Sequence, residues 1–107
     1  MTGWIFLIIA IVAEIIATTA IRSSHGFTVL LPSIVTVAGY AVAFACFAQA
    51  LKSLDLGIAY AIWAGVGTAT VAVIGILVFG EPGSAAKTAG LALIVAGVVL
   101  LNLQGAH

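Results

Sequence analysis

Residues 3–21 read GWIFLIIAIVAEIIATTAI, an apolar run that contains a single ionisable side chain, Glu14. As an α-helix with a rise of 1.5 Å per residue, this run spans about 28 Å, close to the hydrocarbon thickness of a bilayer. Glu14 then lies well inside the hydrocarbon, where an acidic side chain costs roughly 3 kcal/mol on insertion scales. A membrane helix that tolerates this cost commonly uses the group to move ions or protons. The run therefore predicts a membrane-spanning helix with a functional carboxyl group.

The composition of the whole chain is that of a membrane protein. Of its 107 residues, 64% are hydrophobic and 6% are charged, and the mean hydropathy is +1.39, whereas soluble domains carry about 25% charged residues. The net charge is zero, with no basic patch for nucleic acid. No basic region precedes the first apolar run, so we expect it to stay in the mature protein rather than act as a cleaved signal peptide. We expect one integral membrane domain over residues 1–107.

Three more apolar segments follow the first, and short turns separate them. The turns are marked by polar residues, glycine and proline in RSSHG (22–26), KSLD (52–55) and GEPG (80–83). The predicted helices are residues 3–21, 28–51, 56–79 and 84–103. Four spanning helices form an all-α membrane protein with both termini on one side of the membrane.

Glycines mark special positions in the last two helices. Gly65 and Gly67 weaken the third helix by roughly 1 kcal/mol each relative to alanine, which favours either a hinge or close helix packing, or both. Gly90 and Gly97 are seven residues apart and therefore face the same way on the fourth helix, as part of a small-residue stripe that permits close helix approach. We interpret this stripe as a dimerisation surface.

The distribution of basic residues bears on how two copies pair. With the termini inside, Lys52 lies inside, whereas Arg22 and Lys87 lie outside. Because Lys and Arg near helix ends set the orientation, one against two leaves almost no bias. A chain that inserts in both directions can obtain alternating access by pairing two opposed copies, as inverted repeats do within one chain. Pairing also brings two Glu14 side chains together, so we hypothesise an antiparallel homodimer.

The surroundings of Glu14 on its helix favour a binding site. Ala10, Ala17 and Thr18 are its neighbours at helical spacing and are small enough to leave room beside the carboxyl group. A low-dielectric environment favours the neutral form of a carboxyl group, so a proton and a cation compete for one site. The predicted outcome is antiport, with protons moving in and a cation moving out. Thr18 adds a polar contact to this site.

Aromatic side chains elsewhere in the chain suit an organic cation. We expect Tyr40, Tyr60 and Trp63 to present ring faces to the ligand, each contributing about 0.5–2 kcal/mol. Cys46 is the only cysteine, so an intrachain disulfide or a cysteine metal cluster is excluded. Neither a nucleophile–base pair nor a set of metal ligands is visible. The sequence therefore predicts a transporter, not an enzyme, with no metal and no organic cofactor.

Several stretches together resemble one known family over essentially the whole chain. They are AEIIATT (13–19), HGFT (25–28) followed by LPS (31–33), GIAYAIWAGVG (57–67), and GLALIVAGV (90–98) followed by LNL (101–103). These stretches are similar to those of the small multidrug resistance family, and the GIAYAIW run is the most specific of them.

The resemblance implies an antiparallel, dual-topology homodimer in the bacterial plasma membrane that exchanges protons for cations. It also implies that Glu14 is the shared proton and substrate site, and that Tyr40, Tyr60 and Trp63 line the binding chamber. By the same resemblance, residues 65–67 form the bend of the third helix, and Gly90 and Gly97 form the dimer contact.

The family has at least two transport branches. Guanidinium exporters typically carry Trp at the position of Ala17 and Ser at the position of Ala43, and this chain has neither. It is more similar to the promiscuous branch that exports quaternary ammonium and other lipophilic cations, where Tyr40 and a small residue such as Ala10 also fit. The predicted function is proton-coupled export of hydrophobic cations, with guanidinium export as the alternative.

A channel or rotor-ring subunit is a rival from another class, because those proteins also carry a carboxylate in the middle of a helix. Four spanning segments and the aromatic set argue against this rival.

Overall fold

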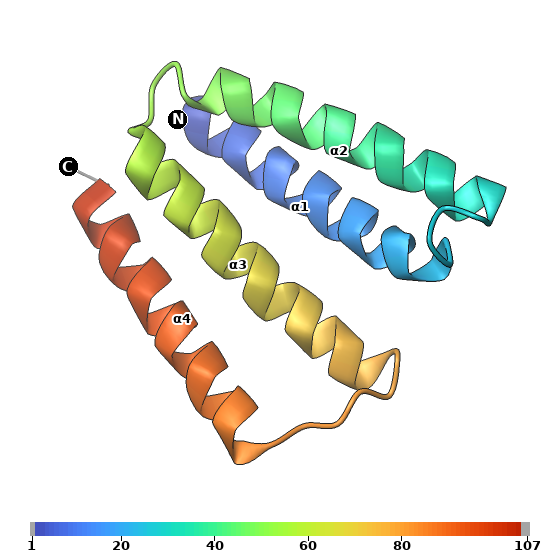
Figure 1. Cartoon of the computed structure of the whole chain (residues 1–107). Coiled ribbons are helices and arrows are strands. Elements are labelled where there is room, and N and C mark those ends of the chain that lie inside the picture. The colour runs from blue at the N-terminus through green and yellow to red at the C-terminus, as the bar shows by residue number, and fades with distance from the viewer. Residues whose placement is uncertain (1, 106–107) are drawn as a thin grey trace. The chain divides into compact units, whose positions relative to one another are not determined.

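The structure, a computed structural model, describes residues 2–105, and the side chains of residues 2–103. These residues form four α-helices and the turns that join them (Figure 1). The helices are α1 (Thr2–Ser23), α2 (Leu30–Ala50), α3 (Leu56–Leu77) and α4 (Ala85–Gly105). Their ends lie within two residues of the predicted ends. All four are long and apolar enough to cross a membrane, which confirms the prediction of four membrane-spanning helices.

The contacts divide the described chain into two compact units, one that ends at Leu54 and one that begins at Asp55. The first unit is the hairpin of α1 and α2, and the second is the hairpin of α3 and α4. Within each unit the two helices pack side by side and run antiparallel, and α1 contacts α2 more extensively than α3 contacts α4 (Figure 1). The prediction of one integral domain over residues 1–107 stays a prediction.

The turn between α1 and α2 is built on one buried serine. Ser24 is completely buried, and its Oγ donates to the carbonyl of Ile21 at 2.7 Å and accepts from the backbone N–H of Phe27 at 3.0 Å. Between these contacts the backbone is left-handed at His25 (φ 48°), Gly26 (φ 72°) and Phe27 (φ 67°). Only glycine adopts this conformation without a steric cost.

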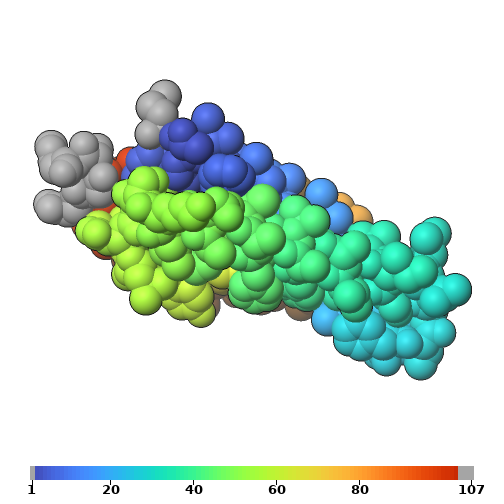
Figure 2. Space-filling view, turned by 90° about the horizontal axis from the view of Figure 1, so that it is seen from above, coloured from blue at the N-terminus to red at the C-terminus, as the bar shows by residue number. Residues whose placement is uncertain are grey.

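Apolar side chains cover the outer surface of α2. Several of them are between one third and two thirds exposed, among them Val35, Val37, Val42 and Phe44. Figure 2 shows α2 (teal to light green) extending from the α1–α2 turn (cyan). In a chain of membrane-spanning helices, such a surface faces lipid or another protein, because both replace the water that an apolar surface avoids.

The α3–α4 unit is held by small residues and by a helix cap. A Cβ at Gly65 would collide with Cγ2 of Val98, so the missing side chain admits α4 at this point. Ser84 Oγ accepts the backbone N–H of Lys87 at 3.1 Å and so caps the start of α4. No residue of α4 between positions 85 and 103 is fully buried, so most of the surface of this helix is free to contact lipid or a second chain.

The left-handed turn makes a testable prediction about stability. Phe27→Gly and Phe27→Ala remove the same ring, but only glycine relieves the strain at φ 67°. We expect the glycine variant to be more stable than the alanine variant by about 1 kcal/mol, measured as the free energy of unfolding in mixed detergent micelles. At Val37, inside α2, the order should reverse because glycine weakens a helix by about 1 kcal/mol relative to alanine. Equal stability of the two Phe27 variants would contradict a left-handed Phe27.

Candidate functional site

Glu14 lies on α1 among small and buried neighbours. Its side chain is half-buried, and its Oε2 atom is buried with no hydrogen-bond partner among the described residues. Ala10 and Ala17, at helical spacing on either side, are completely buried, and Leu7 is 1% exposed. A buried carboxyl oxygen without a donor is costly, so this side of Glu14 has unused capacity to bind a proton or a cation.

Thr18 and Tyr40 join α1 to α2 close to this carboxyl group. Thr18 Oγ1 and the Tyr40 hydroxyl are 2.7 Å apart, and either oxygen can be the donor. Thr18 follows Glu14 by four residues and therefore lies on the same face of α1. The bond brings the hydroxyl end of Tyr40 to that face. A tyrosine hydroxyl deep in a membrane protein needs a hydrogen-bond partner, and Thr18 is that partner here. The predicted contact of Thr18 with the ligand stays a prediction; in the structure its hydroxyl bonds to that of Tyr40.

Two residues that had no individual role in the sequence prediction fix the crossing of α1 and α2. A Cβ at Gly39 would lie 2.8 Å from Cβ of Ala17 and 3.2 Å from the carbonyl oxygen of Ala13. The single hydroxyl proton of the buried Thr36 is shared between the carbonyls of Ala17, at 3.2 Å, and Pro32, at 2.9 Å. The sequence signal was a set of small and polar residues on one face of α2, but their partners depend on how the two helices cross.

Tyr60 and Trp63 form an aromatic pair on α3. Their ring centroids are 6.0 Å apart and the rings are nearly perpendicular, at 85°, an edge-to-face geometry that aromatic rings favour. Trp63 is 7% exposed, whereas Tyr60 is 58% exposed, so the ring of Tyr60 is accessible for stacking. On α2 the rings of Tyr40 and Phe44 are 6.4 Å apart. A common chamber for Glu14 and the α3 pair stays a prediction.

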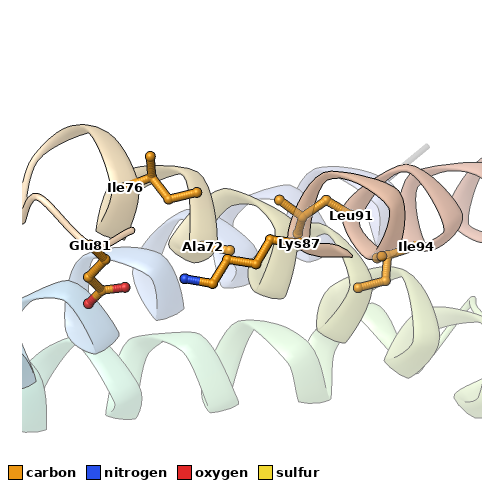
Figure 3. A pocket seen from close by; sticks show the side chains of 7 residues that line it. Ala72, Ile76, Glu81, Lys87, Leu91 and Ile94 are labelled. Carbon is orange, nitrogen blue, oxygen red and sulfur yellow. The ribbon is translucent and has the colours of Figure 1, made fainter. Parts of the chain in front are cut away.

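The glycines predicted to form a hinge in α3 and a dimer contact in α4 differ in their surroundings. α3 is one continuous helix through Gly65 and Gly67. Gly65 contacts α4, which gives it a packing role, and its predicted hinge role stays a prediction. A Cβ at Gly90 or Gly97 would meet nothing within 4 Å, and the space beside Gly90 belongs to a pocket between α3 and α4 (Figure 3). The predicted dimer contact of the two glycines stays a prediction.

The described residues contain no group of three or more His, Cys, Asp or Glu side chains that could hold a metal ion. The absence of a metal and of an organic cofactor stays a prediction from the sequence.

Comparisons with known proteins agree with the resemblance over nearly all of the chain. The model of a family described as "Small Multidrug Resistance protein" matches residues 2–94. The "Quaternary ammonium compound-resistance protein QacE" of Escherichia coli is 50% identical over 103 residues, which cover 96% of this chain and 94% of that protein. The "Multidrug resistance protein mmr" of Mycolicibacterium paratuberculosis is 46% identical, covering 97% and 98%. The "Nicotine metabolites export pump subunit NepA" of Paenarthrobacter nicotinovorans is 52% identical, covering 97% and 90%.

The hydroxyl pair can be tested with a double-mutant cycle on the free energy of unfolding. We expect Thr18→Val and Tyr40→Phe to be coupled by about 1 kcal/mol, because each removes one half of the same hydrogen bond. The control pair is Thr18→Val with Ser84→Ala, which shares no partner and should be additive within about 0.5 kcal/mol. Additive effects of Thr18→Val and Tyr40→Phe would refute the bond.

Proposed function

Since the chain belongs to the small multidrug resistance family, we propose that it exports hydrophobic and quaternary ammonium cations in exchange for protons, which compete for Glu14. It is a multi-pass protein of the bacterial inner membrane. The observation that carries the proposal is the carboxyl group of Glu14, half-buried in a membrane-spanning helix with one oxygen unbonded within the described chain. The names of two relatives, for quaternary ammonium resistance and multidrug resistance, support the class of substrate. The name of a third, an export pump subunit, supports the direction of transport.

The physical basis of the exchange is the cost of a bare charge in a low-dielectric site. A carboxylate on a membrane-spanning helix is stable only if a proton neutralises it or a cation pairs with it. Because no described side chain donates to Oε2 of Glu14, the protein itself supplies little stabilisation of the charge. Binding of a proton therefore weakens binding of the cation, and the cation weakens binding of the proton by the same factor.

Aromatic rings favour organic cations over metal ions as the partner of Glu14. Tyr60 is largely exposed, and its edge contact with Trp63 leaves a ring face accessible. A lipophilic cation against such a face gains about 0.5–2 kcal/mol. In this proposal Tyr40, Tyr60 and Trp63 stack on the ligand, and the small Ala10 leaves the space that it needs.

The guanidinium alternative requires more room at position 17. Ala17 is completely buried, and a Cβ at Gly39 would already lie 2.8 Å from its methyl group. The Trp that is typical of guanidinium exporters does not fit at this crossing without moving α2. The packing of Ala17 thus supports the promiscuous branch.

We also propose that two copies pair in opposite orientations. One chain offers one Glu14, and the open side of α4 at Gly90 and Gly97 provides a surface for a second copy. The weak orientation bias of Arg22, Lys52 and Lys87 allows insertion in both directions. When each of two opposed copies adopts the conformation of the other, the dimer changes from an inside-facing to an outside-facing state.

Proton release by purified protein tests the role of Glu14. Adding tetraphenylphosphonium to the protein in weakly buffered detergent should release protons from the native form. Glu14→Gln should release none and should lower transport in proteoliposomes at least tenfold, to background. The control is Asp55→Asn, which removes an acid from the exposed turn before α3 and should behave as the native form. Equal release from Glu14→Gln and the native form would refute the shared site.

Complementary orientation variants test the antiparallel pairing. Gln49→Arg with Thr2→Arg adds charge on one side of the membrane, and Ser23→Arg with Gly83→Arg adds it on the other; all four positions are exposed. Each double variant alone should lose cellular resistance to a quaternary ammonium compound, because only one orientation inserts. Expressing both together should restore resistance. Full resistance from either variant alone, with one-way insertion shown by site-directed labelling, would rule out the pairing.

A further inference from the structure

Two hydroxyl groups near Glu14 share one hydrogen bond and therefore keep one unused proton. Thr18 Oγ1 and the Tyr40 hydroxyl oxygen are 2.7 Å apart, the usual length of a bond between two hydroxyl groups. Each hydroxyl has one proton and two lone pairs, so the bond uses only one of the two protons. Among the described residues neither hydroxyl has a second hydrogen-bond partner. The position of the unused proton depends on which oxygen is the donor.

Thr18 is placed to connect this hydroxyl pair to the carboxyl group. It follows Glu14 by one helical turn, and a helical side chain leans toward the N-terminus, over the preceding turn. A threonine inside a helix commonly donates to the carbonyl four residues earlier, as Thr88 does to Ser84. Thr18 bonds to Tyr40 instead, and Oε2 of Glu14 is buried without a partner in the described chain. Because side chains one turn apart are neighbours, rotation of the Glu14 carboxyl group joins it to the Thr18 hydroxyl.

The charge of Glu14 then decides the direction of donation along the three groups. A deprotonated carboxylate only accepts hydrogen bonds, whereas a protonated carboxyl group also donates one. In the deprotonated state, Tyr40 donates to Thr18 and Thr18 donates to the carboxylate, which makes a charge-assisted bond. In the protonated state, the carboxyl group donates to Thr18 and Thr18 donates to Tyr40, whose own proton is then free. Each state has two bonds and no proton leaves its oxygen, so the hydroxyl pair stabilises both charge states of Glu14 and fixes neither.

Glu14 is the group near the hydroxyl pair whose charge changes. The helix packed against α1 is α2, which carries no charged side chain and has Tyr40 and Cys46 as its titratable residues. Cys46 follows Tyr40 by six residues and therefore points to a different side of α2. The other basic or titratable side chains in the described part of this unit lie in the last turn of α1 or in the turns that follow the helices: Arg22, His25 and Lys52. The direction of the hydroxyl pair therefore follows the charge of Glu14.

We propose that the hydrogen bond between Thr18 and Tyr40 reverses its direction when Glu14 gains or loses a proton, and that Tyr40 thereby presents the charge state of Glu14 to the ligand. This inference rests on the proposed exchange of proton and cation at Glu14. When Glu14 is deprotonated, Tyr40 exposes only oxygen lone pairs on the side away from Thr18, and these attract a cation. When Glu14 is protonated, Tyr40 exposes the positive end of an O–H bond, which repels a cation. Thr18 is the positioning residue that links the two groups.

The infrared C–O stretch of tyrosine tests the reversal, because a hydroxyl that donates has a shorter C–O bond than one that accepts. The chain has two tyrosines, Tyr40 and Tyr60, so Tyr60→Phe protein made with isotope-labelled tyrosine shows the band of Tyr40 alone. The purified full-length protein is titrated with acid in lipid bilayers without substrate. The C=O band of protonated Glu14 is followed in the same spectra and is identified by its loss in Glu14→Gln.

We expect the Tyr40 band to shift to lower wavenumber on acidification, with the same midpoint at which the Glu14 band grows. In Glu14→Gln the Tyr40 band should not respond to acid. A Tyr40 band that stays in place or shifts to higher wavenumber while the Glu14 band titrates overturns this inference alone. If the Glu14 band does not titrate, the proposed exchange fails together with this inference.

Variants at position 18 show whether Thr18 makes the link. Thr18→Val should abolish the shift of the Tyr40 band while the Glu14 band still titrates, and Thr18→Ser, which keeps the hydroxyl, should restore the shift. The matched control is Thr88→Val, which removes an exposed hydroxyl from α4 and should keep the native shift. Circular dichroism and gel filtration identify any variant that does not fold, and Thr18→Ser and Glu14→Gln then decide. A folded Thr18→Val protein with the native shift overturns the proposal, as does equal loss in Thr18→Ser or in the control.

Discussion

A carboxyl group on a membrane-spanning helix must be neutral or paired, and this constraint governs the α1–α2 unit. Glu14 has one buried oxygen with no partner among the described residues, so neutrality depends on something that the chain itself does not supply there. Its neighbours Ala10 and Ala17 are small and buried, and they leave the carboxyl group accessible without solvating it. A larger or more polar neighbourhood would stabilise one charge state permanently, and the proposed exchange of proton and cation at Glu14 would then stop.

Helix packing in hydrocarbon explains how this arrangement holds together. Lipid tails are as apolar as the helices, so association depends on close contact and on hydrogen bonds rather than on the hydrophobic effect. The α1–α2 unit uses both: Gly39 admits Ala17, Thr36 donates across to α1, and Thr18 pairs with Tyr40. All of these contacts lie within a few residues of Glu14 in the sequence of α1 or opposite it on α2. The same contacts therefore hold α1 against α2 and form the surroundings of the carboxyl group.

The sequence predicted the four helices because hydropathy and turn residues alone determine them in a membrane protein. It also predicted which small residues lie beside Glu14, because helical spacing within one helix determines them. It did not predict the partner of Thr18 or the role of Gly39, because these depend on the crossing of two helices. The left-handed Phe27 was also missed, since sequence rules assign positive φ to glycine, whereas both neighbours of Gly26 have positive φ as well.

Two glycines on α4, Gly90 and Gly97, have no neighbour within reach of an added Cβ. Gly90 and Gly97 face open space, and a glycine that contacts only lipid gives up side-chain contacts and weakens the helix without return. Both residues are better explained if another surface approaches them closely. Gly90 also lines a pocket between α3 and α4, whereas Gly97, two turns further along, lines no part of it. In the proposed dimer, the second chain packs along this apolar length of α4.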